Sequence, residues 1–309
     1  MRAAAVLLAL AAAPPVLEGL DAGFWVVTLS RALIFAIAAM ALQFVLGRGG
    51  LVCFGFAAFM GIGAYAVGVA YANGVEDALV AFPLAMLAAG GFAALTGLAA
   101  LRTRGVHFIM ITLAFGQMAY FAVTALSAYG GDDGMTLWSR STLGGFGWIE
   151  GRWPLYYACL GAAAATWALL RALGASRFGR VIDGARQNPG RMAALGFDVR
   201  RAQLAAYALS GALGGLAGAL LANHAEYVSP AYMSWHRSGE LIVMVVLGGA
   251  ASLGGAGFGA LVVVALEEVL AGWTQHWRIA MGLIVLAVAL FARDGLAGTL
   301  TGALARLRR

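Results

Sequence analysis

The chain contains no lysine, only two cysteines and few charged residues of either sign. All twenty basic residues are arginine, set against 14 acidic residues. Without lysine, the chain has neither the P-loop lysine of an ATPase nor a lysine for Schiff-base chemistry. Cys53 and Cys159 both fall within apolar runs, where a reduced, packed thiol is the ordinary state. A disulfide framework and ATP hydrolysis by this chain are therefore not expected.

Side-chain groups typical of catalytic or metal sites are also lacking. The four histidines, His107, His224, His236 and His276, are far apart and show no metal-ligand spacing. No nucleophile–base pair is evident in the pattern. We therefore predict that the chain is not an enzyme, with no catalytic residue, no metal site and no cofactor. Nothing points to a nucleic-acid partner.

Polar surface is scarce along the whole length. Hydrophobic residues make up 62% of the chain and charged residues 11%, whereas a soluble domain has about 25% charged residues. Apolar runs repeat from end to end, and the alternation of barrel strands is absent. The composition predicts an all-α polytopic membrane protein embedded in a lipid bilayer.

Most of the apolar runs reach the about 20 residues that a helix needs to cross a bilayer. They lie at roughly 24–46, 50–72, 78–100, 105–127, 154–172, 203–223, 239–250, 256–272 and 278–292. An earlier run, 3–17, has two interpretations. Its positive start and small residues resemble a signal peptide, but we favour a retained short span because every later run is also a span.

Run 239–250 is too short to span, and the sequence SLGGAGFG separates it from 256–272. We predict a re-entrant or broken helix pair, whose irregular backbone must be buried in protein or face water. If the pair returns to its own side, fifteen arginines fall in cytoplasmic segments and four in outer segments. This bias favours about eight transmembrane helices plus the pair, both termini in the cytoplasm, and one transmembrane domain over residues 1–309.

Two further features concern packing and the outer surface. The pairs Gly211/Gly215, Gly214/Gly218 and Gly255/Gly259 are small-residue faces that let helix backbones approach closely. The connection 128–153 is the longest outer loop and is rich in glycine, tryptophan and acidic residues. Both an ordered lid or docking surface and a merely interfacial loop remain open for it.

Residues 177–201 form the one long polar segment, with six arginines and two aspartates. We predict a short helix at 177–187, a turn at Asn188-Pro189-Gly190, and a second short helix that reaches Leu195 and stops at Gly196. Ala193, Ala194 and Leu195 offer a small apolar knob within a charged rim, which suits docking on a partner. The alternative is an ordinary positive loop held near anionic lipid.

Four segments, in order, resemble the permease subunits of branched-chain amino acid ABC importers, specifically the LivM type. Residues 50–65, GLVCFGFAAFMGIGAY, are similar to the family's glycine-rich early helix. Residues 101–117 resemble its basic turn and following helix, and 177–222 its ATPase-coupling loop and small-residue helix. Residues 240–259 resemble its interrupted helix. Each segment is weak alone, but four in the right order and spacing are specific.

The resemblance implies a type II ABC importer permease-like fold in the bacterial inner (plasma) membrane. It implies a second, LivH-like permease, two cytoplasmic ABC ATPase subunits (LivG/LivF-like) and a periplasmic solute-binding protein as partners. The cytoplasmic coupling segment is then 174–201. Its implied ATPase-coupling residues are Arg180, Arg186, Gln187, Asn188, Pro189, Ala193, Ala194, Leu195 and Gly196. Gln187 and Pro189 stand where the family commonly carries acidic residues.

Several residues at membrane depth are candidates for a substrate pathway. They are Cys53, Phe56, Tyr65, Thr112, Gln117, Glu240, Gly248, Gly249 and Gly254. Cys53 and Phe56 stand where the family commonly carries Ser and His, which makes this half of the pathway more apolar.

Each kind of candidate has a structural alternative. Thr112 and Gln117, like Gln43 and Ser210, could instead bond between helices. Glu240 is expected to open its helix, where a structural cap rivals substrate contact. Glu267 and Glu268 are expected at an interface.

Two functions are weighed. The first is a permease that moves branched-chain or other amino acids, or a related small polar solute, driven by partner ATPases. The second is an ion-coupled secondary transporter or channel. An ion-coupled transporter would require acidic or histidine relays in mid-membrane, and none is evident in the sequence.

Overall fold

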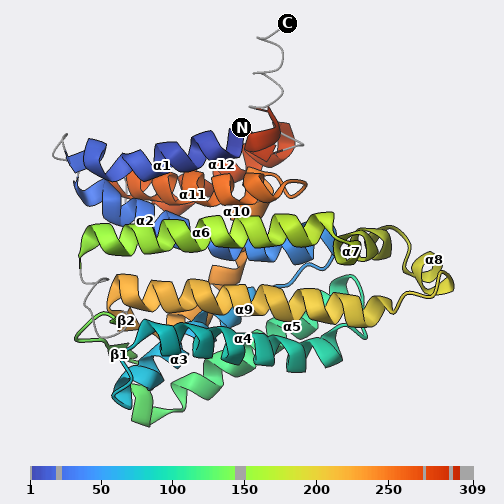
Figure 1. Cartoon of the computed structure of the whole chain (residues 1–309), viewed down its shortest axis with the longest axis horizontal. Coiled ribbons are helices and arrows are strands. Elements are labelled where there is room, and N and C mark those ends of the chain that lie inside the picture. Colours follow the sequence, from blue (N-terminus) through green and yellow to red (C-terminus); the bar gives the residue numbers. More distant parts are fainter. Residues whose placement is uncertain (1, 19–22, 143–150, 274–275, 292–294, 300–309) are drawn as a thin grey trace, which may run out of the picture.

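The computed structural model describes residues 2–18, 23–142, 151–273, 276–291 and 295–299. Long helices lie side by side along the longest axis of the molecule (Figure 1). One end of the bundle carries the short helices α7 and α8, and the other carries the strands β1 and β2. We call these the α8 end and the β end.

Helices account for nearly all of the described elements. The first half contains α1 (Arg2–Glu18), α2 (Gly23–Gln43), α3 (Phe56–Ala72), α4 (Ala78–Ala100) and α5 (Val106–Thr124). The second half contains α6 (Arg152–Ala175), α7 (Arg177–Gln187), α8 (Pro189–Ala194), α9 (Val199–Ala225), α10 (Trp235–Gly248), α11 (Leu253–Trp273) and α12 (Trp277–Phe291). Shorter elements are the π-helical turn Phe44–Arg48, the 3₁₀ turns Ser127–Tyr129 and Pro230–Met233, and the strands β1 (Met135–Thr136) and β2 (Tyr227–Val228).

Among the described residues, six helical segments are long and apolar enough to cross a membrane. They are 23–48, 78–100, 106–124, 152–175, 199–225 and 253–273, and α3 and α12 are apolar but shorter. The prediction of an all-α polytopic architecture is confirmed, while the count of about eight crossings stays a prediction. Helix α2 lies at the centre, in contact with α6, α9, α10 and α11.

The run 50–72 is not one helix, which corrects the prediction. Residues 50–55 form a non-helical connector, and α3 starts at Phe56. Gly50 has φ +67°, a left-handed conformation that favours glycine. Gly55 lies against α5 so closely that a Cβ would overlap the Thr112 carbonyl oxygen. This approach depends on a distant helix, so hydropathy alone could not reveal it.

Helices α10 and α11 form a hairpin, as the prediction of a broken pair required. The backbone of Gly248 lies against Gly255 and Gly259, and Met244 also contacts Gly259. The interruption is shorter than predicted, since it covers residues 249–252, and most of SLGGAGFG is inside α11. Gly255 and Gly259 serve the close helix contact instead of breaking the helix.

The glycines of α9 present two packing faces. A Cβ at Gly211 or Gly215 would meet the alanines of α4 at positions 85, 89 and 93. A Cβ at Gly214 or Gly218 would meet α3 at Phe59 or Met60. The overlapping small-residue pairs therefore place α9 between α3 and α4, which confirms close packing as their role.

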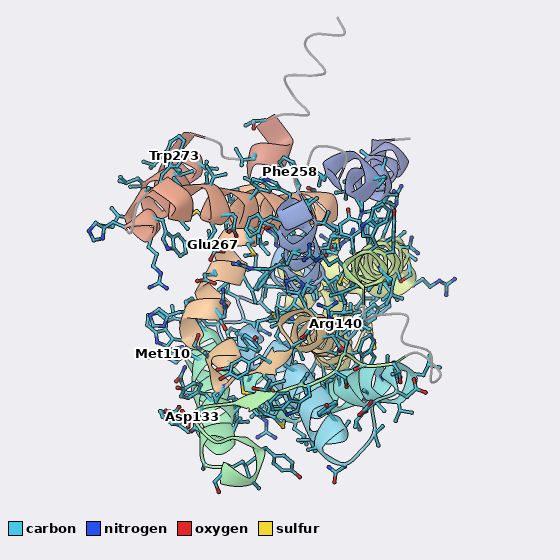
Figure 2. All side chains as sticks on the ribbon, turned by 90° about the vertical axis from the view of Figure 1, so that its left-hand side faces the viewer. Met110, Asp133, Arg140, Phe258, Glu267 and Trp273 are labelled. Atoms are coloured by element: carbon cyan, nitrogen blue, oxygen red, sulfur yellow. The ribbon has the colours of Figure 1, made fainter. Side chains whose placement is uncertain are left out.

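The described part of the loop 128–153 is ordered by contacts with the end of α9. Strand β1 pairs antiparallel with β2, and Ser141 donates its amide hydrogen to Asn223 Oδ1 at 2.7 Å. Arg140 forms an ion pair with Glu226 at 2.8 Å. Figure 2 looks onto this β end and labels Arg140 and Asp133. These contacts favour an ordered surface; residues 143–150 lie outside the described part.

Run 3–17 forms α1, which packs on α2 and α6. Pro14 and Pro15 lie inside this helix. The hydroxyl groups of two α6 tyrosines reach its backbone: Tyr156 donates to the Leu10 carbonyl at 2.6 Å, and Tyr157 to the Ala11 carbonyl at 3.2 Å. The arginines at 293, 306, 308 and 309, which support the predicted charge bias, lie outside the described residues.

Candidate functional site

Helix α7 lies on the α8 end of the bundle through one apolar face. Its buried residues Gly179, Ile182 and Ala185 recur every three positions and so share one side of the helix. Phe178 stacks on Phe44 with ring centroids 6.5 Å apart. Gly179 packs against the carbonyl of Gly174, where a side chain would not fit. The polar segment is therefore seated on the bundle.

Arginine side chains fix α7 to the end of α2. Arg186 Nη1 donates to the carbonyl oxygen of Gly47. Arg48 Nη1 donates to Asp183 Oδ2 at 3.1 Å and to the Gly174 carbonyl at 3.0 Å. The Arg48–Asp183 pair is partly exposed, so solvent weakens it, but the added carbonyl bonds fix its geometry. Arg186 thus holds the segment from inside.

A single residue, Asn188, separates the two short helices. It follows the last residue of α7 and caps α8 by accepting from the Arg191 amide at 2.9 Å. Pro189 is the first residue of α8, where its missing N–H costs nothing. The two predicted helices are confirmed, but the predicted turn through Gly190 is shorter. Gly196 has φ +86°, as its predicted role as the stop requires.

The outer side of the segment remains uncovered. Helix α8 has no buried residue and stands out from the bundle (Figure 1). Leu195 is 65% exposed and Phe197 is 47% exposed. Of the nine predicted coupling residues, all but Pro189 are exposed. They are Arg180, Arg186, Gln187, Asn188, Ala193, Ala194, Leu195 and Gly196. An apolar knob with an arginine rim can dock into a groove of complementary shape and charge.

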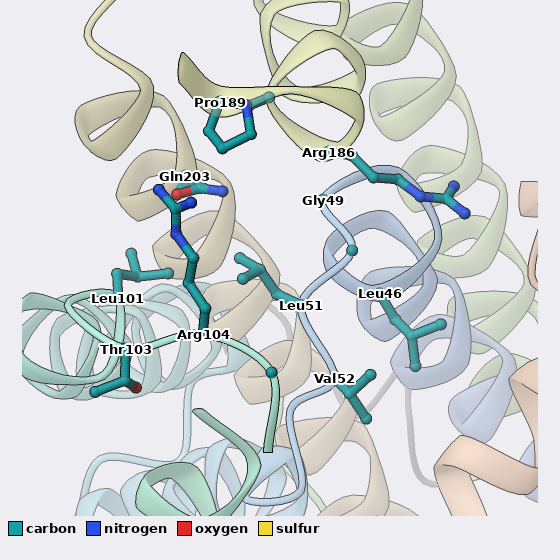
Figure 3. Close-up of a pocket in the computed structure, with 13 residues that line it drawn as sticks. Leu46, Gly49, Leu51, Val52, Leu101, Thr103, Arg104, Arg186, Pro189 and Gln203 are labelled. Atoms are coloured by element: carbon teal, nitrogen blue, oxygen red, sulfur yellow. The ribbon is translucent and has the colours of Figure 1, made fainter. Parts of the chain in front are cut away.

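Beneath α8 lies a cavity of about 540 Å³ (Figure 3). Its wall includes residues 49–52, the α4–α5 turn 103–105 and Pro189. Arg104 and Gln203 contribute polar groups to its wall, and both are labelled in Figure 3. The α7–α8 segment therefore rests over a partly open space at its junction with the turns of the bundle.

Three predicted pathway residues gather at the connector before α3. Cys53 Sγ lies 3.4 Å from the Tyr207 hydroxyl. Thr112 accepts from the Phe54 amide at 3.2 Å and donates to the Ile109 carbonyl at 2.9 Å. Phe56 is buried beside them at the start of α3. Thr112 therefore bonds between segments, as the alternative interpretation of this residue holds.

The other pathway candidates lie elsewhere. Tyr65 is buried further along α3, and Gln117 is half-buried on α5. Gly248 packs against α11, Gly249 lies in the hairpin turn with φ +111°, and Gly254 is exposed. Within one chain these candidates do not form one continuous lining.

Glu240 does not open its helix, which corrects the prediction. Helix α10 begins five residues earlier, at Trp235, so Glu240 lies in its second turn. Its carboxylate binds Arg237 at 2.6 Å, and no capping role remains for it. It also lines a cavity of about 240 Å³ between α10, α11 and α12, with Glu267 and Arg278.

Sequence reasoning did not bring Arg31 together with the two glutamates of α11. Arg31 Nη2 lies 2.5 Å from Glu267 Oε2, and Nη1 lies 3.8 Å from Glu268. An arginine inside a predicted span calls for an acidic partner, and this was the available signal. Glu267 is labelled in Figure 2, where it lies between α11 and the neighbouring helices.

Comparison with known proteins decides the family. The model of a family described as "Branched-chain amino acid transport system / permease component" matches residues 25–292. The chain belongs to this family. The resemblance drawn from four sequence segments is thereby confirmed. The match covers α2 from its third residue and every helix from α3 to α12.

Two named relatives agree with this membership. The high-affinity branched-chain amino acid transport system permease protein LivM of Escherichia coli (strain K12) is 27% identical over 292 residues. The protein of the same name from Salmonella typhimurium (strain LT2) is 26% identical over 290 residues. Each match covers 85% of this chain and 68% of the relative. No solved structure gives a significant match.

Membership of this permease family sets the class of the protein. It is a multi-pass membrane protein and a permease component of a transport system, not an enzyme. The family match includes α7 and α8, so the exposed segment belongs to the part of the chain that this branched-chain amino acid permease shares with its family.

Proposed function

We propose that the chain is the transmembrane permease subunit of an ATP-driven importer for branched-chain or other amino acids, or a related small polar solute. Family membership and the names of the LivM relatives support the substrate class. The observation that carries the coupling role is the α7–α8 segment. It is fixed to the bundle by Arg48 and Arg186 and presents Leu195 outward.

The proposed partners follow from the family. They are a second, LivH-like permease, two cytoplasmic ABC ATPase subunits (LivG/LivF-like) and a periplasmic solute-binding protein. The α8 end faces the cytoplasm and the β end faces outward, since the arginine bias of the sequence favours that orientation. Both termini are then cytoplasmic, with about eight crossings and the α10–α11 hairpin in the inner membrane.

In the proposed mechanism, α7 and α8 have different tasks. Ala193, Ala194 and Leu195 fill a groove on an ATPase subunit, and Arg180 and Gln187 meet its rim. Arg186 and Asn188 keep the two helices at a fixed angle to the bundle. Closure of the ATPase pair then moves α7 as one body with the end of α2, which shifts the permease between its outward-open and inward-open arrangements.

The pathway residues stay part of this proposal. Because the candidates of one chain are scattered, we place the path at the face shared with the second permease. There Gln117 and Glu240 would offer polar groups, and the hairpin glycines would expose backbone. The more apolar pair Cys53 and Phe56 would favour solutes with aliphatic side chains.

Co-purification of the chain with its ATPase subunits tests the coupling role. Truncating an anchor at the centre of a docking surface costs about 2 kcal/mol or more, a roughly 30-fold loss of affinity. Leu195→Asp should therefore strip the ATPases from the complex. Trp138→Ser is the control, because Trp138 is also a large exposed apolar side chain, at 87% exposure, but lies near the β end.

Two results would overturn this function. Equal ATPase retention by Leu195→Asp and Trp138→Ser would remove the docking role of the segment. Solute uptake driven by a proton or sodium gradient through the chain alone would favour the secondary transporter instead.

A further inference from the structure

A π-helical turn, Phe44–Arg48, ends α2 at the α8 end of the bundle. Such turns are rare and occur mostly as single turns, often at functional sites. This one lies between two segments that are far apart in the sequence, namely α7 and the turn of the α10–α11 hairpin. Its residues contact both.

On the side of α7, the turn is bonded by its backbone and its side chains. The Gly47 carbonyl accepts from Arg186, and Arg48 binds Asp183. Phe44 stacks on Phe178. These contacts make the turn and α7 one mechanical unit, because a displacement of α7 must either break them or carry the turn along.

On the other side, the same turn touches the hairpin. Gln43 Nε2 donates to the Ala250 carbonyl at 3.0 Å. Gly47 lies so close that a Cβ there would overlap the same carbonyl oxygen. No side chain of residue 47 can therefore lie between the turn and the hairpin, and a displacement of the backbone at Gly47 reaches Ala250 directly.

The amide of Gln43 is left half satisfied in this arrangement. Gln43 is 2% exposed, and among the described residues its Oε1 has no hydrogen-bond partner. A buried acceptor without a donor is costly. A shift of the hairpin or of the π turn that brings a donor to Oε1 would stabilise a second arrangement, so this junction is suited to switching between two states.

We propose that Gln43 and Gly47 are positioning residues that transmit the movement of α7 to the α10–α11 turn. The inference rests on the proposed function, since it describes how docking at α8 reaches the interrupted helix pair. Residues 249–252 are the moving part, and the π turn of α2 is the link.

The test uses the full complex of both permeases and the ATPases in liposomes, with solute uptake and ATP hydrolysis measured together. Gln43→Leu replaces the amide with an apolar side chain and so removes the donor to Ala250. We expect uptake per ATP hydrolysed to fall at least tenfold, with hydrolysis within twofold of the wild type.

Ser210→Ala is the matched control. It removes another buried hydrogen bond to α2, from Ser210 to the Ala41 carbonyl, which is not part of the route. A merely structural effect would act alike in both variants, so only a loss confined to Gln43→Leu supports the inference. An unchanged ratio of uptake to hydrolysis in Gln43→Leu overturns it.

A second measurement does not depend on uptake. Nucleotide binding to the wild-type complex should change amide hydrogen exchange at residues 249–252, and Gln43→Leu should abolish that change. No change in the wild type would overturn the inference. A wild-type complex that neither hydrolyses ATP nor takes up solute would overturn the proposed function and this inference together. If the wild-type complex is active, an unchanged ratio in Gln43→Leu or an unchanged exchange at residues 249–252 overturns the inference alone.

Discussion

The contact between α6 and α1 predicts a specific rescue. In a helix, the amide of residue i donates to the carbonyl of residue i−4. Proline has no amide hydrogen, so Pro14 and Pro15 leave the carbonyls of Leu10 and Ala11 without their helical donors. The hydroxyl groups of the two α6 tyrosines reach these same two carbonyls. We therefore consider Tyr156→Phe, which keeps the ring and removes the donor.

The free-energy cost of Tyr156→Phe follows from the burial of Tyr156 and from the lack of another donor for the Leu10 carbonyl. A buried acceptor that loses its donor costs about 1–3 kcal/mol. Hydrogen bonds between membrane helices average only about 0.6 kcal/mol, because the freed groups find other partners. The Leu10 carbonyl has no donor in its own helix, and Tyr156 is fully buried. We expect a loss of about 1–2 kcal/mol in the docking of α1.

Tyr157 provides the comparison within the same pair of helices. It is 41% exposed, and its bond to the Ala11 carbonyl is longer, at 3.2 Å. Tyr157→Phe should cost less than about 0.5 kcal/mol, since its longer hydrogen bond is weaker and its side chain is only partly buried.

Amide hydrogen exchange of residues 2–18, measured in lipid nanodiscs, reports the docking. A loss of about 1–2 kcal/mol corresponds to a roughly 5- to 30-fold decrease in protection. The decisive experiment adds Pro14→Ala, which restores an amide hydrogen at residue 14 as the helical donor to the Leu10 carbonyl. In that background Tyr156→Phe should cost less than about 0.5 kcal/mol, because the helix satisfies its own carbonyl. An equal cost in both backgrounds would refute the reasoning.

Two further substitutions test the packing and the charges of the bundle. Gly218→Leu should abolish folded, monodisperse protein on size-exclusion chromatography, because the leucine side chain would overlap the Met60 backbone. The control Gly161→Leu should be tolerated, since a Cβ at Gly161 has nothing within 4 Å. In thermal unfolding, Glu267→Gln should lower the free energy of unfolding by about 1.5–3 kcal/mol. Glu268→Gln should lower it by less than about 1 kcal/mol, because the Glu268 carboxylate is 3.8 Å from Arg31. Equal effects of the two substitutions would contradict an ion pair centred on Glu267.

The positions of the helices could be predicted because span length and hydropathy are local properties of the chain. Helices α4 and α6 lie within a few residues of their apolar runs. The start of α3 could not be predicted, since the connector 50–55 depends on how closely Gly55 approaches α5. The length of the hairpin turn was missed for a similar reason, because a glycine that breaks a helix and one that packs it look alike in sequence.

The candidate site divides in the same way. The ends of α7 and α8 follow from local signals, an asparagine cap and a glycine in the left-handed region. The direction in which each arginine points is a tertiary property. Arg180 and Arg186 both precede the same turn and are both exposed, yet Arg186 donates to the Gly47 carbonyl. The pairing of Arg31 with Glu267 joins α2 to α11, and no local pattern connects them.

The contacts at the α8 end give a structural reason for arginine instead of lysine. The guanidinium of Arg48 binds a carboxylate and a carbonyl at once, and that of Arg186 reaches a backbone carbonyl from a neighbouring helix. A planar guanidinium with five donors suits such fixed multiple contacts, whereas a lysine ammonium acts as a compact, strongly hydrated point charge. In the coupling role that we propose, this segment transmits movement from a partner to the bundle, which requires bonds of fixed direction. The arginines at this junction supply those directions, so their choice follows from mechanics as well as from the sign of the charge.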